Sequence, residues 1–333
     1  MNLFAFTRRL IDIPSVSGDE GGVARFLVES LLTRGFRAEL QKVEENRANV
    51  VAWGEAPPRF VLSTHLDTVP PHIASGEDDE FIYGRGACDA KGIIAAQVWA
   101  ATRLRDAGVK DVGLLFTVDE EQASLGARVA NQHRLAESCQ FLINGEPTDN
   151  LLATGSKGSL RARVKTTGRA AHSAYPEHGE SAIEKLLDVL ADVRRHIWPR
   201  DEFFGETTVN VGTIAGGTRS NVIPAEAEAV LHVRLTTPSV VIKDALETIA
   251  AGRAEVEYLS VSEPVRMLAV EGFEQRVVRF TTDISYLDRW GRPLLLGPGS
   301  ILDAHTPHER VQKRELERAV ELYVQLVRRL REA

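Results

Sequence analysis

The chain has 333 residues, which at about 150 residues per domain predicts two domains, and its hydrophobic content of 43% is typical of a soluble globular protein. Its formal charge of −7 argues against nucleic acid as the main partner, because phosphate binding depends on clustered lysine and arginine. Cys88 and Cys139 are too few for a disulfide framework and indicate a reducing compartment. The first residues lack the charged start of a secretory signal, and no apolar run reaches about 18 residues, so we expect a cytoplasmic protein without a membrane span.

Predicted helices alternate with predicted strands over the first 155 residues. Amphipathic patterns predict helices over 3–12 and 21–34, and a further helix is expected over 91–108. Apolar, β-branched runs predict buried strands over 59–69 and 112–121. This alternation predicts an α/β domain with a mostly parallel sheet and helices on both faces.

The pattern changes near residue 156. The next predicted elements are a half-exposed strand, a helix, two strands, a helix and a strand, at 159–168, 181–197, 207–217, 227–237, 239–252 and 254–260. This β-α-β-β-α-β order is that of the ferredoxin-like fold. We therefore expect an α+β domain over 156–264, inserted into a catalytic domain made of 1–155 and 265–333.

Acidic and imidazole side chains stand at the ends of predicted strands or in glycine-rich loops. In an open α/β sheet, the carboxyl ends of the strands face one crevice, where ligands bind. The residues in question are His65, Asp67, Asp89, Glu120, Glu121, Glu146 and His305. Several carboxylates cannot be buried together without cations. Oxygen and nitrogen ligands without cysteine suit zinc, with manganese or cobalt as substitutes.

Taken singly, each of these residues also has a plainer explanation. His65 could belong to a surface pair at a strand end, and Asp89 could cap the helix that follows it. Glu120 could be part of a solvated charge run, Glu146 could be a turn residue before Pro147, and His305 could be an exposed loop histidine. Their joint occurrence in one domain favours the metal site.

Seven ordered segments resemble one metallopeptidase family, which holds acetylornithine deacetylase, succinyl-diaminopimelate desuccinylase, glutamate carboxypeptidase and aminoacylase. The segments are STHLDTVP, GRGACDAKG, TVDEEQASLGA, NGEPT, GRAAHSAYPEHGESAI, GGTRSNVIPAEAE and GPGS…AHTPHE. The resemblance extends from near residue 8 to the terminal helix. It implies a catalytic α/β domain, an inserted lid that often forms a homodimer, and a site with two zinc ions.

The resemblance implies a ligand role for five residues. Asp89 resembles the ligand that bridges the two zinc ions. His65 and Glu146 would complete one zinc site, and Glu121 and His305 would complete the other.

Two further acids resemble catalytic residues of the family. Glu120 resembles the general base, and Asp67 resembles the carboxylate behind the histidine ligand. Successive strand side chains point to opposite faces, so Glu120 and Glu121 can both face the site only if the strand has ended before them.

Residues outside the metal set resemble substrate-contacting positions of the family. His172 would donate to the developing oxyanion, often from the partner subunit of a dimer. Asn221 and Arg234 resemble lid residues that hold the substrate's carboxylate, for which the arginine fork is suited. Gly297 and Gly299 would let the backbone approach the substrate, although a plain turn also accounts for them.

The segments NGEPT and GPGS…AH most resemble the deacetylase and desuccinylase branch. The leading hypothesis is hydrolysis of an N-acyl amino acid, as in acetylornithine deacetylase, with succinyl-diaminopimelate desuccinylase and a dipeptidase or carboxypeptidase as alternatives. A further alternative frees lysine or ornithine from an acidic carrier protein. Arg161, Arg163 and Lys165 on one strand face could bind such a carrier, but a solvated sheet face is the simpler explanation of these cations. A non-catalytic binding protein would be expected to lack a ligand or the base, and none is missing.

Overall fold

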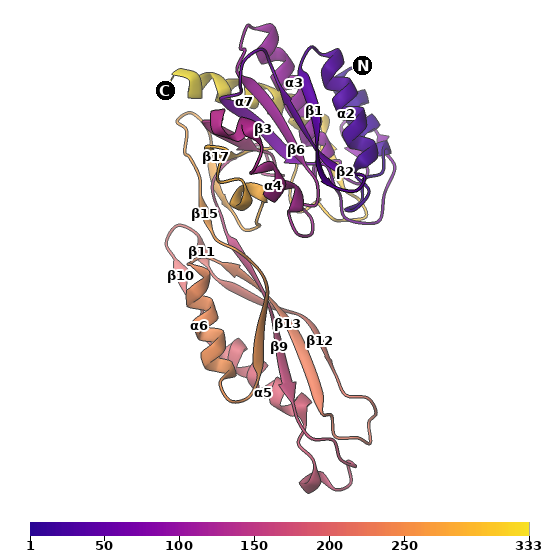
Figure 1. The fold of residues 1–333 in the computed structure, drawn as a ribbon, viewed down its shortest axis with the longest axis vertical. Helices are drawn as coiled ribbons and strands as arrows, with labels where there is room; N and C mark the ends of the chain where they lie inside the picture. Colours follow the sequence, from indigo (N-terminus) through magenta and orange to yellow (C-terminus); the bar gives the residue numbers. More distant parts are fainter. Residues whose placement is uncertain (333) are drawn as a thin grey trace. The chain divides into compact units, whose positions relative to one another are not determined.

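The computed structural model describes residues 1–332 and divides into two compact units (Figure 1). The first unit comprises Met1–Thr154, Met267–Arg276 and the segment from Thr282 onward. The inserted unit comprises Gly155–Arg266 and Val277–Thr281. The short second segment of the inserted unit lies outside the range 156–264 that the sequence pattern indicated.

The first unit contains a large mixed sheet, so the predicted α/β class is confirmed. Its strands follow the order β1 (Arg37–Glu44), β2 (Arg47–Trp53), β6 (Val112–Thr117), β3 (Phe60–His65), β7 (Phe141–Asn144), β17 (Arg292–Leu295), β8 (Leu152–Ser156) and β15 (Val265–Arg266), and β16 (Gln275–Val278) also pairs with β8.

The expectation of a mostly parallel sheet holds only for the four central strands. β3 runs parallel to β6 and β7, and β17 runs parallel to β7. β1, β2 and β8 pair antiparallel with their neighbours. At the edge formed by β1 and β2, the antiparallel direction follows from the connection between the strands. A short turn at Glu45 and Asn46 joins β1 to β2, and strands joined by such a turn form an antiparallel hairpin.

Helices cover both faces of this sheet, as predicted. The larger core, which includes Leu62 and Leu114, packs against α1 (Leu3–Asp12), α2 (Gly21–Thr33), α3 (Lys91–Asp106) and α7 (Lys313–Glu332). The other face, which includes Val61 and Leu115, packs against α4 (Leu125–Ala130) and the 3-10 helices η1 (Arg134–Ser138) and η3 (Asp283–Tyr286). Neighbouring residues of β3 and β6 thus enter different cores, which explains why each of these strands contains consecutive apolar residues.

The inserted unit has the predicted ferredoxin-like order of elements. These are β9 (Gly158–Thr167), α5 (Ala182–Arg195), β12 (Thr208–Gly216), β13 (Glu226–Leu235), α6 (Ser239–Ala250) and β14 (Glu255–Ser262). The strands form one antiparallel sheet in the order β12-β13-β9-β14. Leu160, Ala162 and Val164 of β9 enter the core together with residues of α5 and α6, while the intervening polar residues occupy the opposite face.

The remaining elements are short. β18 (Arg310–Gln312), β5 (Phe81–Tyr83) and β4 (Gly76–Glu77) form a three-stranded sheet, β10 (Arg200–Asp201) pairs with β11 (Gly205–Glu206), and η2 spans Pro176–His178. Among residues 1–332, no helix has both the length and the apolar character needed to cross a membrane.

Candidate metal centre

Three neighbouring parallel strands end at the same edge of the large sheet. His65 is the last residue of β3 and lies opposite Thr117, the last residue of β6. Ser63 of β3 lies opposite Asn144, where β7 ends. The residues that follow these strand ends, including Glu120, Glu121 and Glu146, therefore emerge beside one another, as the position of ligand sites in open α/β sheets predicts.

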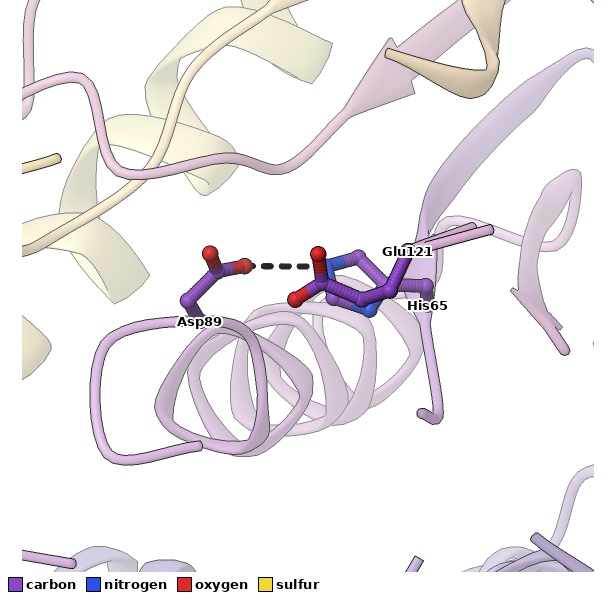
Figure 2. A group of neighbouring side chains, drawn as sticks. All are labelled: His65, Asp89 and Glu121. Atoms are coloured by element: carbon purple, nitrogen blue, oxygen red, sulfur yellow. Dashed lines mark hydrogen bonds and ion pairs between the residues drawn. The ribbon is translucent and has the colours of Figure 1, made fainter. Parts of the chain in front are cut away.

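Five predicted ligands come together at this edge. Figure 2 shows His65, Asp89 and Glu121 pointing toward one another, and one ligand atom from each lies within 4.8 Å of the others. His65 Nε2 lies 2.9 Å from Asp89 Oδ1 and 3.9 Å from Glu146 Oε2. His305 Nε2 lies 2.9 Å from Glu121 Oε1 and 3.2 Å from Asp89 Oδ2. Asp89 thus presents one carboxylate oxygen to each imidazole.

The plainer explanations of these residues do not match the geometry. His65 and Asp67 are buried and are not a surface pair. Asp89 does not cap α3, whose N-cap residue is Ala90 and lacks a side-chain cap. His305 is half exposed, yet its ring nitrogen faces two carboxylates instead of solvent.

Asp67 connects His65 to the turn that carries the two glutamates. His65 Nδ1 lies 2.9 Å from the carbonyl oxygen of Asp67 and 3.5 Å from its Oδ1, so the main-chain oxygen is the closer partner. The Asp67 carboxylate accepts hydrogen bonds from the main-chain N–H groups of Glu120 and Glu121, at 3.0 and 3.2 Å, and from the Ser17 hydroxyl at 2.7 Å. Asp67 therefore orients both a candidate ligand and the candidate base.

Strand β6 ends before Glu120 and Glu121. This is required if both adjacent side chains are to face the same site, one as a base and the other as a ligand. β6 stops at Thr117, and Asp119 has a φ of 71°. The main-chain oxygen of Asp119 then accepts a hydrogen bond from the Ser124 N–H at 2.7 Å. This turn removes the strict alternation of a strand, so neighbouring side chains can serve one site.

A buried ion-pair network stabilises the same turn, and no sequence motif marks it. Arg47 donates to both carboxylate oxygens of Glu20, at 2.7 and 2.9 Å, and to Asp119 Oδ1 at 2.7 Å. Hydrogen bonds to Glu20, and then to Asp119, hold the pKa of Arg47 above its ordinary value although burial opposes this. The guanidinium fork is thereby fixed between two segments.

The electrostatics of the cluster favour a bound cation. Burial, reinforced by neighbouring carboxylates, raises the pKa of both Glu120 and Glu146 well above the usual range. Hydrogen bonds to Asp89 and Glu121 raise the pKa of His305 to about 10. Glu146 Oε1 is buried without a hydrogen-bond donor. Carboxylates and imidazoles that lack other partners fit a divalent metal such as zinc, manganese or cobalt.

Asp283 is a further buried acid near the cluster that the sequence did not reveal. Burial raises its pKa to about 6, and its Oδ2 accepts from the Thr117 hydroxyl at 2.7 Å. Its Oδ1 is buried without a hydrogen-bond partner. It follows β16 in a segment whose sequence carries no motif, and only the folded chain brings it to the end of β6.

The candidate substrate residues of the inserted unit separate into two places. His172 and Asn221 lie together, because residues 172 and 222 form a β-bridge and the Ser173 N–H donates to the Asn221 carbonyl at 3.0 Å. Arg234 lies near the opposite end of β13, where it pairs with Ser159. Eight residue steps along β13 separate Arg234 from the end nearer Asn221, which is roughly 26 Å at about 3.3 Å per residue.

Gly297 and Gly299 each have a packing reason to lack a side chain. A Cβ on Gly297 would lie 2.5 Å from the carbonyl oxygen of Glu146. A Cβ on Gly299, whose φ is 85°, would lie 2.6 Å from the Cβ of Cys88. These glycines therefore allow the loop after β17 to lie directly against the segments that carry Glu146 and Asp89.

Comparison with known proteins places this site in a family. Residues 61–329 match the model of Peptidase family M20/M25/M40, whose members are metal-dependent hydrolases. The fold and the His/Asp/Glu cluster thus define a metallohydrolase. The chain belongs to Peptidase family M20/M25/M40.

Individual relatives agree with this assignment. A protein described as a probable carboxypeptidase from Aspergillus terreus is 38% identical, and the match covers 97% of this chain and 85% of that protein. A tripeptidase from Staphylococcus aureus has a similar structure, with a TM-score of 0.80, 21% identity and coverage of 97% and 96%. An M20 family metallo-carboxypeptidase from Sulfolobus solfataricus gives a TM-score of 0.78 at 16% identity, with 99% of each chain covered.

Proposed function

We propose that this protein hydrolyses the amide bond between an acyl group and an amino acid that keeps a free carboxylate. The observation that supports the proposal most strongly is the convergence of His65, Asp89 and Glu121 at the strand ends, beside the candidate base Glu120. The proposed substrate class includes N-acyl amino acids and peptides that lose their last residue, because both release an amino acid with a free carboxylate.

Two zinc ions, replaceable by cobalt or manganese, would occupy the centre. Asp89 would contact both ions, His65 and Glu146 would hold one, and Glu121 and His305 would hold the other. When bound, the ions supply Lewis acidity, which polarises the amide carbonyl and makes the attacking water more acidic. The carboxylates of the cluster then have the cations that their burial requires.

Glu120 would transfer the proton. It takes the proton that the attacking water loses and later delivers it to the amine that leaves. Its main-chain N–H is held by the Asp67 carboxylate at 3.0 Å, so its position is set by a group that also contacts His65. Burial favours the protonated form of Glu120, which suits a carboxyl group that must hold a proton between the two steps.

Residues of the inserted unit would bind the substrate. Burial lowers the pKa of Arg234, and within residues 1–332 no ion pair engages its guanidinium, which suits it to a substrate carboxylate. His172 would donate to the developing oxyanion, and Asn221, which lies beside His172, would enter the same site with it. His172 and Asn221 lie beyond the start of β13, whereas Arg234 lies near its end. This separation supports a homodimer in which one chain supplies His172 and Asn221, and the other supplies Arg234, to a shared site.

N-acetylornithine is the leading candidate substrate, because the segments NGEPT and GPGS…AH resemble those of the deacetylase branch. A carboxypeptidase is the second candidate, because the Aspergillus terreus relative at 38% identity is described as a probable carboxypeptidase. A carrier-protein substrate is less well supported. Arg163 and Lys165 each lie 2.9 Å from Glu257 Oε2, so two of the three cations on that strand face are already paired.

A turnover panel tests the proposal. The zinc-loaded protein is assayed with N-acetylornithine, N-acetyl-lysine, succinyl-diaminopimelate and dipeptides with free or amidated carboxyl ends, and Glu120→Gln is the inactive control. We expect release of a free amino acid from at least one substrate with a free carboxylate and none from its amide. Equal turnover of the amide, or turnover that survives a chelator, would contradict the proposal.

A further inference from the structure

A buried ion pair lies beside the metal centre and has no place in the chemistry described so far. Arg85 Nη1 donates to Glu309 Oε2 at 2.5 Å, and both side chains are almost fully buried. Burying two charges costs several kcal/mol for each ion before their attraction is counted, and apolar residues of similar size often stabilise a fold as well or better. Stability alone is therefore a weak reason for charges at this position.

The contacts of Glu309 point to a more specific role. Its Oε1 accepts main-chain hydrogen bonds from Gly86 at 2.9 Å, Asp89 at 3.1 Å and Cys88 at 3.3 Å. These N–H groups belong to the turn that ends at Asp89, just before α3. One carboxylate oxygen thus holds the backbone of the residue whose side chain lies between the two imidazoles.

Arg85 extends this connection to two other segments. It donates to the carbonyl of Thr306 at 3.2 Å, next to His305, and to the carbonyl of Pro71 at 3.3 Å, in the loop that follows β3. The main-chain N–H of Gly84 also donates to the carbonyl of Glu309 at 3.0 Å. The pair therefore joins the segments that carry His65, Asp89 and His305.

We propose that Glu309 is a positioning residue that places Asp89 so that one carboxylate reaches both metal ions. The inference rests on the proposed two-metal site and adds a residue that does not touch the metals. This positioning role also explains why Arg85 and Glu309 are charged although they are buried. Three N–H donors on one oxygen and a guanidinium on the other require a group that accepts on both sides, and a carboxylate does so.

The test is titration of the metal-free full-length protein with Zn²⁺, and separately with Co²⁺, by calorimetry and visible absorption. In Glu309→Gln the amide presents an NH₂ group either to the main-chain donors or to Arg85, so one set of contacts is lost in either orientation. We expect zinc affinity to fall by about 10- to 100-fold, as for other residues that orient metal ligands, and the cobalt absorption bands to change. Glu321→Gln, which removes an exposed ion pair with Arg103, is the matched control and should leave both measurements unchanged.

A second variant keeps the test decisive if Glu309→Gln fails to fold. Glu309→Asp retains the charge that balances Arg85 but shortens the side chain by one methylene, so it cannot reach both partners. We expect a smaller fall in melting temperature than in Glu309→Gln, because the counter-charge of Arg85 remains, and a similar loss of zinc affinity. Wild-type affinity in either folded variant would overturn the inference, whereas failure of the wild-type protein to bind metal would overturn the proposed function itself.

Discussion

The two units of the protein use charged side chains in opposite ways. In the inserted unit, charges on the sheet face pair with each other at the surface, as Lys165 and Glu257 do at 2.9 Å. In the first unit, buried carboxylates and imidazoles crowd together at the strand ends, and Glu146 Oε1 has no donor at all. The number of charged residues therefore says little about function, whereas a buried cluster of carboxylates and imidazoles indicates a cation site.

The largest effect on turnover is expected at the candidate base of the first unit. Glu120→Gln keeps the shape of the side chain but cannot accept the proton of the attacking water. We expect kcat to fall by about 10²- to 10⁴-fold while zinc content is unchanged, because Glu120 is not a proposed ligand. Steady-state kinetics and metal analysis of the same sample check this. A variant with near wild-type kcat would remove Glu120 from the mechanism.

A smaller effect on turnover, with a clear loss of stability, is expected where buried charges of the first unit do have a partner. Arg47→Met leaves Glu20 buried without a counter-charge and frees Asp119 from its guanidinium contact. We expect the free energy of unfolding to fall by about 3–5 kcal/mol, because one partner of a buried pair remains unpaired. Urea denaturation measures this, and Arg103→Met, at an exposed pair, is the control. An equal change in both variants would show that burial of the network has no energetic consequence.

The titration of the cluster predicts a pH dependence of metal binding. In the metal-free protein, burial raises the pKa of Glu146 and so favours its protonated form, and carboxylate contacts raise the pKa of His305 to about 10, so His305 holds a proton near neutrality. Metal ligands must be deprotonated, and zinc binding should therefore release protons and strengthen as the pH rises from about 6 to about 8. Calorimetry in two buffers of different ionisation enthalpy measures the release. An affinity that does not change with pH would contradict the assignment of these ligands.

The smallest effect is expected on the surface of the inserted unit. Lys165→Ala removes an exposed ion pair with Glu257, and such pairs contribute about 0–1 kcal/mol. We expect unchanged zinc affinity, unchanged kcat and a free energy of unfolding within about 0.5 kcal/mol of wild type. Kinetics and urea denaturation check this. A large loss of turnover would mean that the basic sheet face binds a substrate after all, and the carrier-protein alternative would return.

Local patterns were sufficient to predict that acidic and imidazole side chains cluster at one edge of the large sheet. The end of a strand is visible in the sequence where an apolar run is followed by acidic residues. Neighbouring parallel strands end at the same edge of a sheet, so they bring His65, Glu121 and Glu146 together there. The ferredoxin-like order of the inserted unit was also predictable, because alternation of period two and amphipathic helices mark each of its elements.

The supporting residues could not be predicted in the same way. Arg47, Asp283 and Glu309 act through contacts with segments about 70 to 220 residues away in the chain, and no local pattern encodes such contacts. The antiparallel edges of the large sheet were missed because apolar runs do not reveal strand direction. Asn221 and Arg234 were predicted to hold the substrate carboxylate together, but Asn221 lies beside His172, and Arg234 lies near the other end of β13. This separation depends on strand register, which the motifs do not contain.

The number of metal ions bound per chain is the decisive measurement for a two-metal centre. The protein is stripped with a chelator, reloaded with excess zinc, passed through a desalting column and analysed for zinc and protein by mass spectrometry. We expect two zinc ions per chain in the wild type and a clear loss in Asp89→Asn, with turnover restored only in the wild type. A wild-type chain that retains no zinc, or an Asp89→Asn variant that retains both ions, would contradict the proposed two-metal centre.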